Sequence, residues 1–124
     1  MPILIVEIVT GPGERVPEGT AAAIADAAAA ALGTPPGRTW VRLHVLAGGA
    51  YAEDGGGPPT GVRPVFVQVL KASVSAQPEL EQEISALAAA VARACHRPVE
   101  NIHIVYEPAA AGRIAFGGKL VPGG

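Results

Sequence analysis

The chain has 124 residues, of which 49% are apolar and 16% are charged. This length corresponds to one domain, and we expect a single domain over residues 1–124. Nine Lys and Arg against eleven Asp and Glu give a formal net charge of -2. That charge disfavours nucleic-acid binding, because it supplies no positive field for phosphate backbones. A single cysteine excludes an intrachain disulfide and a Cys-x-x-Cys redox pair.

The first residues, Met-Pro-Ile-Leu-Ile-Val-Glu, lack the basic start of a signal peptide. No apolar run approaches the roughly 20 residues that cross a bilayer, so we expect a cytoplasmic protein without membrane contact. Aromatic residues are only 4% of the chain, so the core must consist of Ala, Val, Ile and Leu. We expect oligomerisation to add the burial that such a small core lacks.

The first half of the chain has the pattern of a βαβ unit. Residues 2–9 are rich in β-branched side chains and predict a buried strand. Residues 17–32 are mostly alanine and are followed by Gly33, which predicts a helix with its stop signal. In residues 40–46 apolar and polar side chains alternate, which is typical of a strand with one apolar side.

The pattern returns after a segment of about residues 47–63 that is rich in Gly and Pro and predicts a linker. We expect a strand at 64–70, a helix at 78–97 and a strand at 99–107. Parallel strands joined through a helix cross over right-handedly. The sequence therefore predicts an α/β fold of two tandem βαβ units, 2–56 and 64–121. They form a four-stranded sheet with two helices on one face.

The two units look like copies of each other. An offset of 62 superposes Pro2 on Pro64, and the same offset aligns the later Gly-Gly pairs. In the second strands an offset of 61 is needed to keep the same side on the helices, because a slip of one residue turns a strand over. This offset places Arg42 opposite His103. We expect the second unit to be structural and to supply side chains to neighbouring sites.

The Met-Pro start, the doubled βαβ layout at this length and the Gly117-Gly118-Lys119 ending are similar to the tautomerase superfamily. That family includes 4-oxalocrotonate tautomerase, 5-carboxymethyl-2-hydroxymuconate isomerase and macrophage migration inhibitory factor. The resemblance covers nearly the whole chain. It implies an α+β tautomerase-type fold, a homotrimer with active sites near the first strands, and catalysis without a cofactor.

The resemblance implies that Pro2 is the catalytic residue. Removal of Met1 would leave a secondary amine, whose pKa starts near ~7.7–8.0 and falls towards neutrality in an apolar pocket beside cations. Such an amine is a general base for keto–enol proton transfer. We therefore expect a tautomerase that acts on a small 2-oxo or 2-hydroxy-dienoic carboxylic acid. Pro64 is an amide in mid-chain and has no basicity.

Two alternatives stay open. A Pro2 amine that remains protonated would act as an acid, as the family's hydratase-type members, decarboxylases and dehalogenases do. The chain could also keep the fold without catalysis. Retention of Met1 would favour this last alternative, since Pro2 would then be an amide.

Several further residues are candidates for substrate binding. Arg42 matches the family's Val-Arg arginine, whose forked guanidinium suits a carboxylate, although a solvent-facing arginine explains the same pattern. Lys71 follows the third strand, close to where the decarboxylases and dehalogenases carry arginines. With one cation there, a single acid group fits better than a muconate.

Three more candidates each have a structural explanation beside the functional one. Tyr51 precedes Gly55-Gly56 and is expected to line a pocket wall, to donate a hydrogen bond, or to be a loop aromatic. Arg113 is a candidate ligand or an interface salt-bridge partner. His103 is a candidate donor or a sheet histidine. His44, His96 and His103 lack metal-ligand spacing, so we expect no metal.

Overall fold

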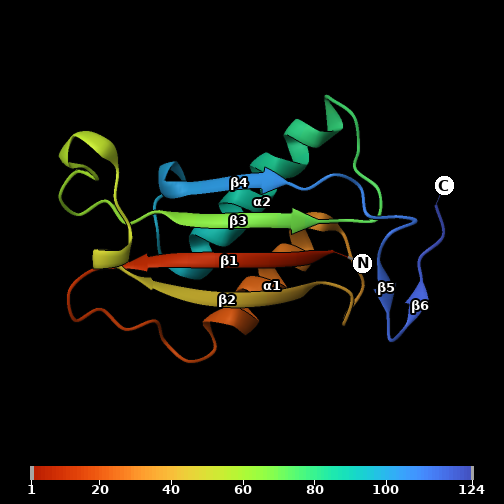
Figure 1. Cartoon of the computed structure of the whole chain (residues 1–124), viewed down its shortest axis with the longest axis horizontal. Coiled ribbons are helices and arrows are strands. Elements are labelled where there is room, and N and C mark those ends of the chain that lie inside the picture. The colour runs from red at the N-terminus through yellow and green to blue at the C-terminus, as the bar shows by residue number, and fades with distance from the viewer. Residues whose placement is uncertain (1, 124) are drawn as a thin grey trace.

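The structure is a computed structural model that describes residues 2–123 of the chain. It contains two α-helices, a four-stranded sheet, a C-terminal two-stranded hairpin and three short 3-10 turns (Figure 1). In chain order these elements are β1 (Ile3–Thr10), α1 (Thr20–Leu32), β2 (Trp40–Ala47), η1 (Gly48–Ala50), η2 (Asp54–Gly56), β3 (Val65–Leu70), α2 (Glu79–Cys95), η3 (Val99–Asn101), β4 (Ile102–Tyr106), β5 (Ala115–Phe116) and β6 (Lys119–Leu120).

The main sheet has the strand order β2-β1-β3-β4. β1 pairs in parallel with β2, β3 pairs in parallel with β4, and the two central strands β1 and β3 are antiparallel. Both helices cover the same face of this sheet (Figure 1). The expected arrangement of two βαβ units with both helices on one face is confirmed.

The core lies between the sheet and the helices and consists of aliphatic side chains. Its fully buried members include Leu4 and Val6 of β1, Ile24 of α1 and Leu87 of α2. The alternation along β1 turns every second side chain into this core. The other face of the sheet carries no helix, so its side chains remain accessible.

Two elements begin three residues later than predicted. α1 begins at Thr20 rather than at residue 17, because Gly19 has a φ of 86°, outside the helical region. β4 begins at Ile102 rather than at residue 99. The N–H of Asn101 donates to the carbonyl of Pro98 at 3.0 Å, and this closes a 3-10 turn before the strand.

The repeat is related by an odd offset throughout, and the superposition of Pro2 on Pro64 is wrong. In β1 the side chains that face the helices have even numbers, such as Leu4 and Val6, whereas in β3 they have odd numbers, such as Val67 and Val69. An offset of 62 would exchange the two faces of the sheet. Pro2 and Pro64 therefore do not occupy equivalent positions.

The Gly- and Pro-rich segment 47–63 forms a separate lobe beyond the end of β2, at the left of Figure 1. It contains η1, η2 and an isolated bridge between Glu53 and Gly57. At the opposite end, the hairpin β5–β6 turns at Gly117 and Gly118, with φ of 58° and 82°. Positive φ at both central residues is the geometry of a tight hairpin turn, and glycine adopts it without strain.

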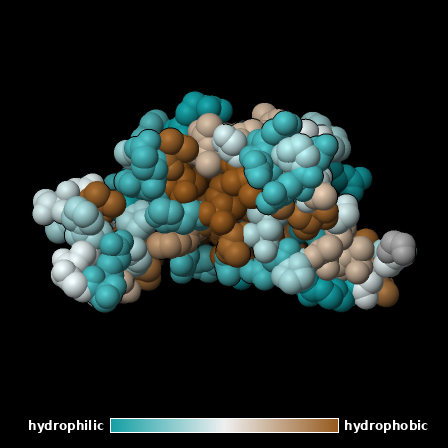
Figure 2. All heavy atoms as spheres, turned by 90° about the horizontal axis from the view of Figure 1, so that it is seen from above, coloured by the Kyte–Doolittle hydropathy of each residue, from teal (hydrophilic) through white to brown (hydrophobic). Residues whose placement is uncertain are grey.

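Apolar surface gathers in a band at the middle of the molecule when it is seen from the side of α2 and β4 (Figure 2). β4 is an edge strand, and its Val105 is exposed. An edge strand with exposed apolar side chains is a surface on which another chain can pair.

None of the helices in residues 2–123 combines the length and apolar composition that a bilayer crossing requires.

Candidate active site

Pro2 stands immediately before β1 and is buried. Its carbonyl accepts a hydrogen bond from the N–H of Trp40 at 3.1 Å, so the pairing of β1 with β2 extends to this residue. On the other side, β1 pairs with β3 through Ile3 and Leu70. Pro2 and Lys71 each adjoin this last pair, so the fold brings both residues to the same end of the sheet.

Lys71 belongs to a three-residue network on the helix side of the sheet. Its Nζ donates to Oε1 of Glu83 on α2 at 2.9 Å, with side chains only 19% and 16% exposed. The hydroxyl of Tyr106, at the end of β4, donates to the other oxygen, Oε2. Glu83 therefore joins the ends of β3 and β4 to the first turns of α2.

The network changes the acidity of its members. Burial alone raises the pKa of Glu83, but the hydrogen bonds from Tyr106 and Lys71 outweigh it and hold the pKa below the usual 4.5. Burial, together with the bond to the Glu83 carboxylate, raises the pKa of Tyr106 well above its usual value. At neutral pH Glu83 is therefore a carboxylate and Tyr106 a protonated phenol.

A cavity of about 430 Å³ lies at this end of the molecule, between the end of β3 and the hairpin β5–β6. Three cationic residues line it, Arg38, Lys71 and Lys119. The rest of its wall is mostly apolar, with Leu70, Ile114, Phe116, Leu120, Val121 and Pro122 among its members. An apolar cavity with a few cations has the chemistry that a small organic acid requires.

The side chain of Trp40 fastens the hairpin to the sheet. Its ring packs edge-on against Phe116, with centroids 5.3 Å apart and an interplanar angle of 88°. The indole N–H donates to the carbonyl of Gly37 at 3.1 Å. This contact holds the hairpin wall of the cavity beside the start of β2.

Arg42 lies on the opposite, helix-free face of the same end of the sheet. It pairs with Ile5, three residues from Pro2, and lines a smaller cavity of about 240 Å³. Ile3 and Leu70 line this cavity too, and Leu70 is shared with the hairpin cavity. Glu107 completes it and accepts a long hydrogen bond, 3.5 Å, from Gln68. The two cavities therefore adjoin at Leu70, which pairs with Ile3, the residue next to Pro2.

Arg113 lies near this end, on the segment that leads to β5. The N–H of Ala110 donates to the carbonyl of Lys71 at 2.9 Å, which fixes this segment beside β3. The guanidinium of Arg113 donates to the carbonyls of Pro108 and Ala109, at 2.8 and 3.3 Å. Within one chain Arg113 thus stabilises its own turn.

Tyr51 and His103 lie at the other end of the sheet. His103 packs against Phe66 with centroids 5.5 Å apart, and Tyr51 packs against the same ring at 5.7 Å. Phe66 pairs with Glu7, five residues beyond Pro2, which is roughly 16 Å along a strand. The hydroxyl of Tyr51 donates to Glu53 at 2.6 Å, and this bond raises the pKa of Tyr51. One chain does not bring these two residues to Pro2.

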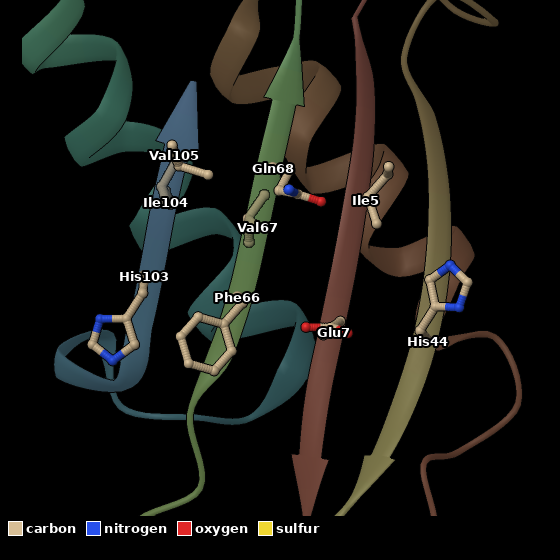
Figure 3. A pocket seen from close by; sticks show the side chains of 9 residues that line it. All are labelled: Ile5, Glu7, His44, Phe66, Val67, Gln68, His103, Ile104 and Val105. Carbon is tan, nitrogen blue, oxygen red and sulfur yellow. The ribbon is translucent and has the colours of Figure 1, made fainter. Parts of the chain in front are cut away.

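A cavity of about 570 Å³ covers this part of the helix-free face. A row of four side chains, His44, Glu7, Phe66 and His103, crosses all four strands and points away from the helices (Figure 3). Residues 2–123 contain no group of three or more His, Cys, Asp and Glu side chains arranged to hold a metal ion.

Comparison with known proteins gives a match in structure alone. No protein-family model matches the sequence, and no curated protein is similar to it in sequence. Solved structures do match over nearly the whole chain. A fused 4-oxalocrotonate tautomerase described as a wild-type symmetric trimer has a TM-score of 0.71 at 19% identity, covering 96% of this chain and 94% of its own. The chain has the tautomerase fold.

Two further structures show how varied the proteins with this fold are. Macrophage migration inhibitory factor from Oncomelania hupensis has a TM-score of 0.69 at 21% identity, covering 99% of this chain and 84% of its own. N1, a member of the cis-3-chloroacrylic acid dehalogenase family, has a TM-score of 0.71 at 19% identity, covering 95% and 83%. A fused 4-oxalocrotonate tautomerase, a macrophage migration inhibitory factor and a member of a dehalogenase family therefore share this architecture, and the activity has to be argued from the site.

Sequence reasoning missed four residues of this tautomerase-fold site: Arg38, Glu83, Tyr106 and Lys119. A signal for Arg38 was present, because β1 and β2 are parallel and residues just before them meet at one edge of the sheet. Glu83 lies in the second turn of α2. Its partners are 12 and 23 residues away, a distance that no local periodicity reports.

Proposed function

We propose that this protein is a cofactor-independent tautomerase in which the amine of Pro2 transfers a proton on a small 2-oxo or 2-hydroxy-dienoic carboxylic acid. The observation that carries the proposal is the position of Pro2. It lies immediately before β1, whose first residue, Ile3, pairs with Leu70, and Leu70 lines both cavities.

This environment supports a basic amine at neutral pH. Once Met1, which lies outside the described residues, has been removed, Pro2 carries a secondary amine. Burial and nearby cations both disfavour the ammonium form and move its pKa towards neutrality. A base with a pKa near the working pH contributes on the order of 10² to 10⁴ in rate to proton transfer.

Carboxylate binding is assigned to the cations around Pro2. Arg42 approaches from the helix-free face, and its fork can meet both oxygens of a carboxylate. Lys71 approaches from the hairpin cavity, where its ammonium is already paired with Glu83. One anchoring cation on each side fits a compact substrate with one acid group.

Two of the remaining candidates need a second copy of the chain. We assign Tyr51 and His103 to the sites of neighbouring copies in a homotrimer, because they lie far from Pro2 in their own chain. Arg113 lies near the Pro2 end and stays a candidate ligand or interface partner. The symmetric trimer of the fused 4-oxalocrotonate tautomerase and the exposed edge strand β4 support this assembly. Two βαβ units joined by residues 47–63 form each copy.

The test compares the processed chain with a chain that has no proline amine. Pro2→Leu keeps Met1, because aminopeptidase requires a small second residue, and intact mass establishes the N-terminus of each preparation. We expect ketonisation of phenylpyruvate and 2-hydroxymuconate enols, followed in the ultraviolet, to fall at least ~10²-fold in kcat/KM.

Pro64→Ala is the matched control, since it removes the other strand-initial proline without touching the amine. It should retain activity within a few fold. Turnover by a preparation whose mass includes Met1 would contradict the role of Pro2.

A second candidate is a hydratase-type reaction, decarboxylation or dehalogenation, with a protonated Pro2. The structural match to a member of the cis-3-chloroacrylic acid dehalogenase family favours it. The pKa of the Pro2 amine, measured by nitrogen NMR titration, separates the two candidate functions. A value near neutrality supports the tautomerase, and a value well above 8 supports the hydratase-type reaction with a protonated Pro2.

A further inference from the structure

The Lys71 ammonium is available both to a cavity and to an ion pair. It lines the 430 Å³ hairpin cavity, and it is also bonded to Glu83 on α2 at 2.9 Å. An ammonium has three N–H donors, so a second carboxylate can approach it while Glu83 stays bound. Any such carboxylate then meets the negative charge of Glu83 at short range.

Glu83 is held in this position by two contacts. Tyr106 donates to Oε2 and Lys71 donates to Oε1, so both carboxylate oxygens are engaged and the side chain is only 16% exposed. The charged and titratable groups around this end come from several elements. They are Arg38 before β2, Lys71 after β3, Glu83 on α2, Tyr106 on β4, Glu107 after β4, and Lys119 on β6.

We propose that Glu83 is a specificity-determining residue of the Pro2 site, which limits carboxylate binding by occupying Lys71. The inference rests on the proposed function only in taking the ligand to be a small carboxylic acid. Glu83 touches neither Pro2 nor, by this proposal, the substrate. It acts through Lys71, and it makes a second acid group on the ligand unfavourable.

Removing Glu83 should change ligand affinity in the direction opposite to that expected for the loss of a merely structural contact. Loss of a supporting residue weakens ligand binding, whereas loss of a competing carboxylate strengthens it. Removing the Glu83 charge leaves the Lys71 ammonium to pair with the ligand alone, and a charge-assisted bond of this kind contributes strongly to affinity.

The probe is benzoylformate, a 2-oxo acid without a hydrogen on the carbon next to its ketone, so it binds but cannot enolise. We expect Glu83→Gln to lower its Kd, measured by calorimetry, about fivefold to tenfold. Lys71→Met in the Glu83→Gln background should return the Kd to the unaltered value or above it. Glu81→Gln removes the same charge from an exposed position of α2 and should change the Kd less than twofold.

A Kd that is unchanged or raised in a folded Glu83→Gln variant would overturn the proposal. If that variant does not fold, the carboxyl carbon resonance of Glu83 in the unaltered chain gives the same answer. Saturating benzoylformate should shift it, and an unmoved resonance would refute the competition.

These measurements involve no turnover. A chain that binds as expected but does not tautomerise would refute the proposed function and leave the role of Glu83 standing. A chain that tautomerises, but whose Kd for benzoylformate does not respond to Glu83→Gln, would support the proposed function and refute the role of Glu83.

Discussion

Arg97 and Glu14 form an ion pair of 3.1 Å that joins the segment after α2 to the loop after β1. The same guanidinium donates to the carbonyls of Val9 and Arg63, at 3.1 and 3.3 Å. One partly buried side chain therefore supplies donors to acceptors on three separate stretches of chain, at the end of the sheet opposite Pro2.

Replacing Arg97 should destabilise the fold strongly. Arg97→Met keeps the apolar stem but leaves the two carbonyls and the Glu14 carboxylate without this donor. We expect the free energy of unfolding, measured in urea, to fall by roughly 2–4 kcal/mol. Arg93→Met, at an exposed position of α2, should change it by less than about 0.5 kcal/mol. Equal losses in both variants would show that the contacts of Arg97 contribute nothing specific.

Stability should decrease at acid pH in a way that depends on Glu83. Burial acts to raise the pKa of Glu83, but Tyr106 and Lys71 hold it below the 4.5 of the unfolded chain. The unfolded state therefore takes up the proton first as the pH falls. The stabilisation is complete above about pH 4.5 and is lost as the pH falls through the folded-state value.

Urea unfolding at pH 7 and at pH 3.5 tests this dependence. The unaltered chain should lose more stability between the two pH values than Glu83→Gln does, because the variant has no carboxyl to protonate at this position. Glu14, whose pKa is also lowered, titrates in both chains and cancels in the comparison. Identical losses would argue against the network around Glu83.

The hairpin can be monitored through the single tryptophan of the chain. Trp40 is 44% exposed and is covered in part by Phe116. Phe116→Ala removes that cover, so we expect a red shift of the emission and more efficient quenching by acrylamide. Phe66→Ala truncates the other phenylalanine at the far end of the sheet and should leave the emission unchanged. The opposite pattern would place Trp40 away from the hairpin.

Cys95 should be inert in the folded protein. It is buried at the end of α2, and burial raises the pKa of its thiol to about 11, with a small opposing effect of Arg97. At pH 8 only about one molecule in a thousand then carries the reactive thiolate. A disulfide reagent should label it slowly in buffer and rapidly in denaturant. Rapid labelling of the folded chain would contradict its burial.

Local periodicity was sufficient to predict the elements and their layers. Alternation in residues 40–46 depends on neighbours two positions apart, and such a pattern is readable in one dimension. The helix-free sheet face follows from it as well. Local sequence did not give the helix start at Thr20, because a left-handed Gly19 excludes the turn before it.

The sequence by itself determined two βαβ units, an aliphatic core, and a proline ahead of the first strand beside candidate cations. Only the tertiary structure decided which cations lie near Pro2. The antiparallel register of β1 and β3 brings Lys71 to the end of the sheet at which Pro2 lies and leaves Tyr51 and His103 at the far end. Strand register, and the packing of segments that are distant in sequence, depend on the simultaneous burial of whole apolar faces of the sheet and helices. The joining of Lys71, Glu83 and Tyr106 is therefore a property of the assembled layers, and no stretch of sequence contains it.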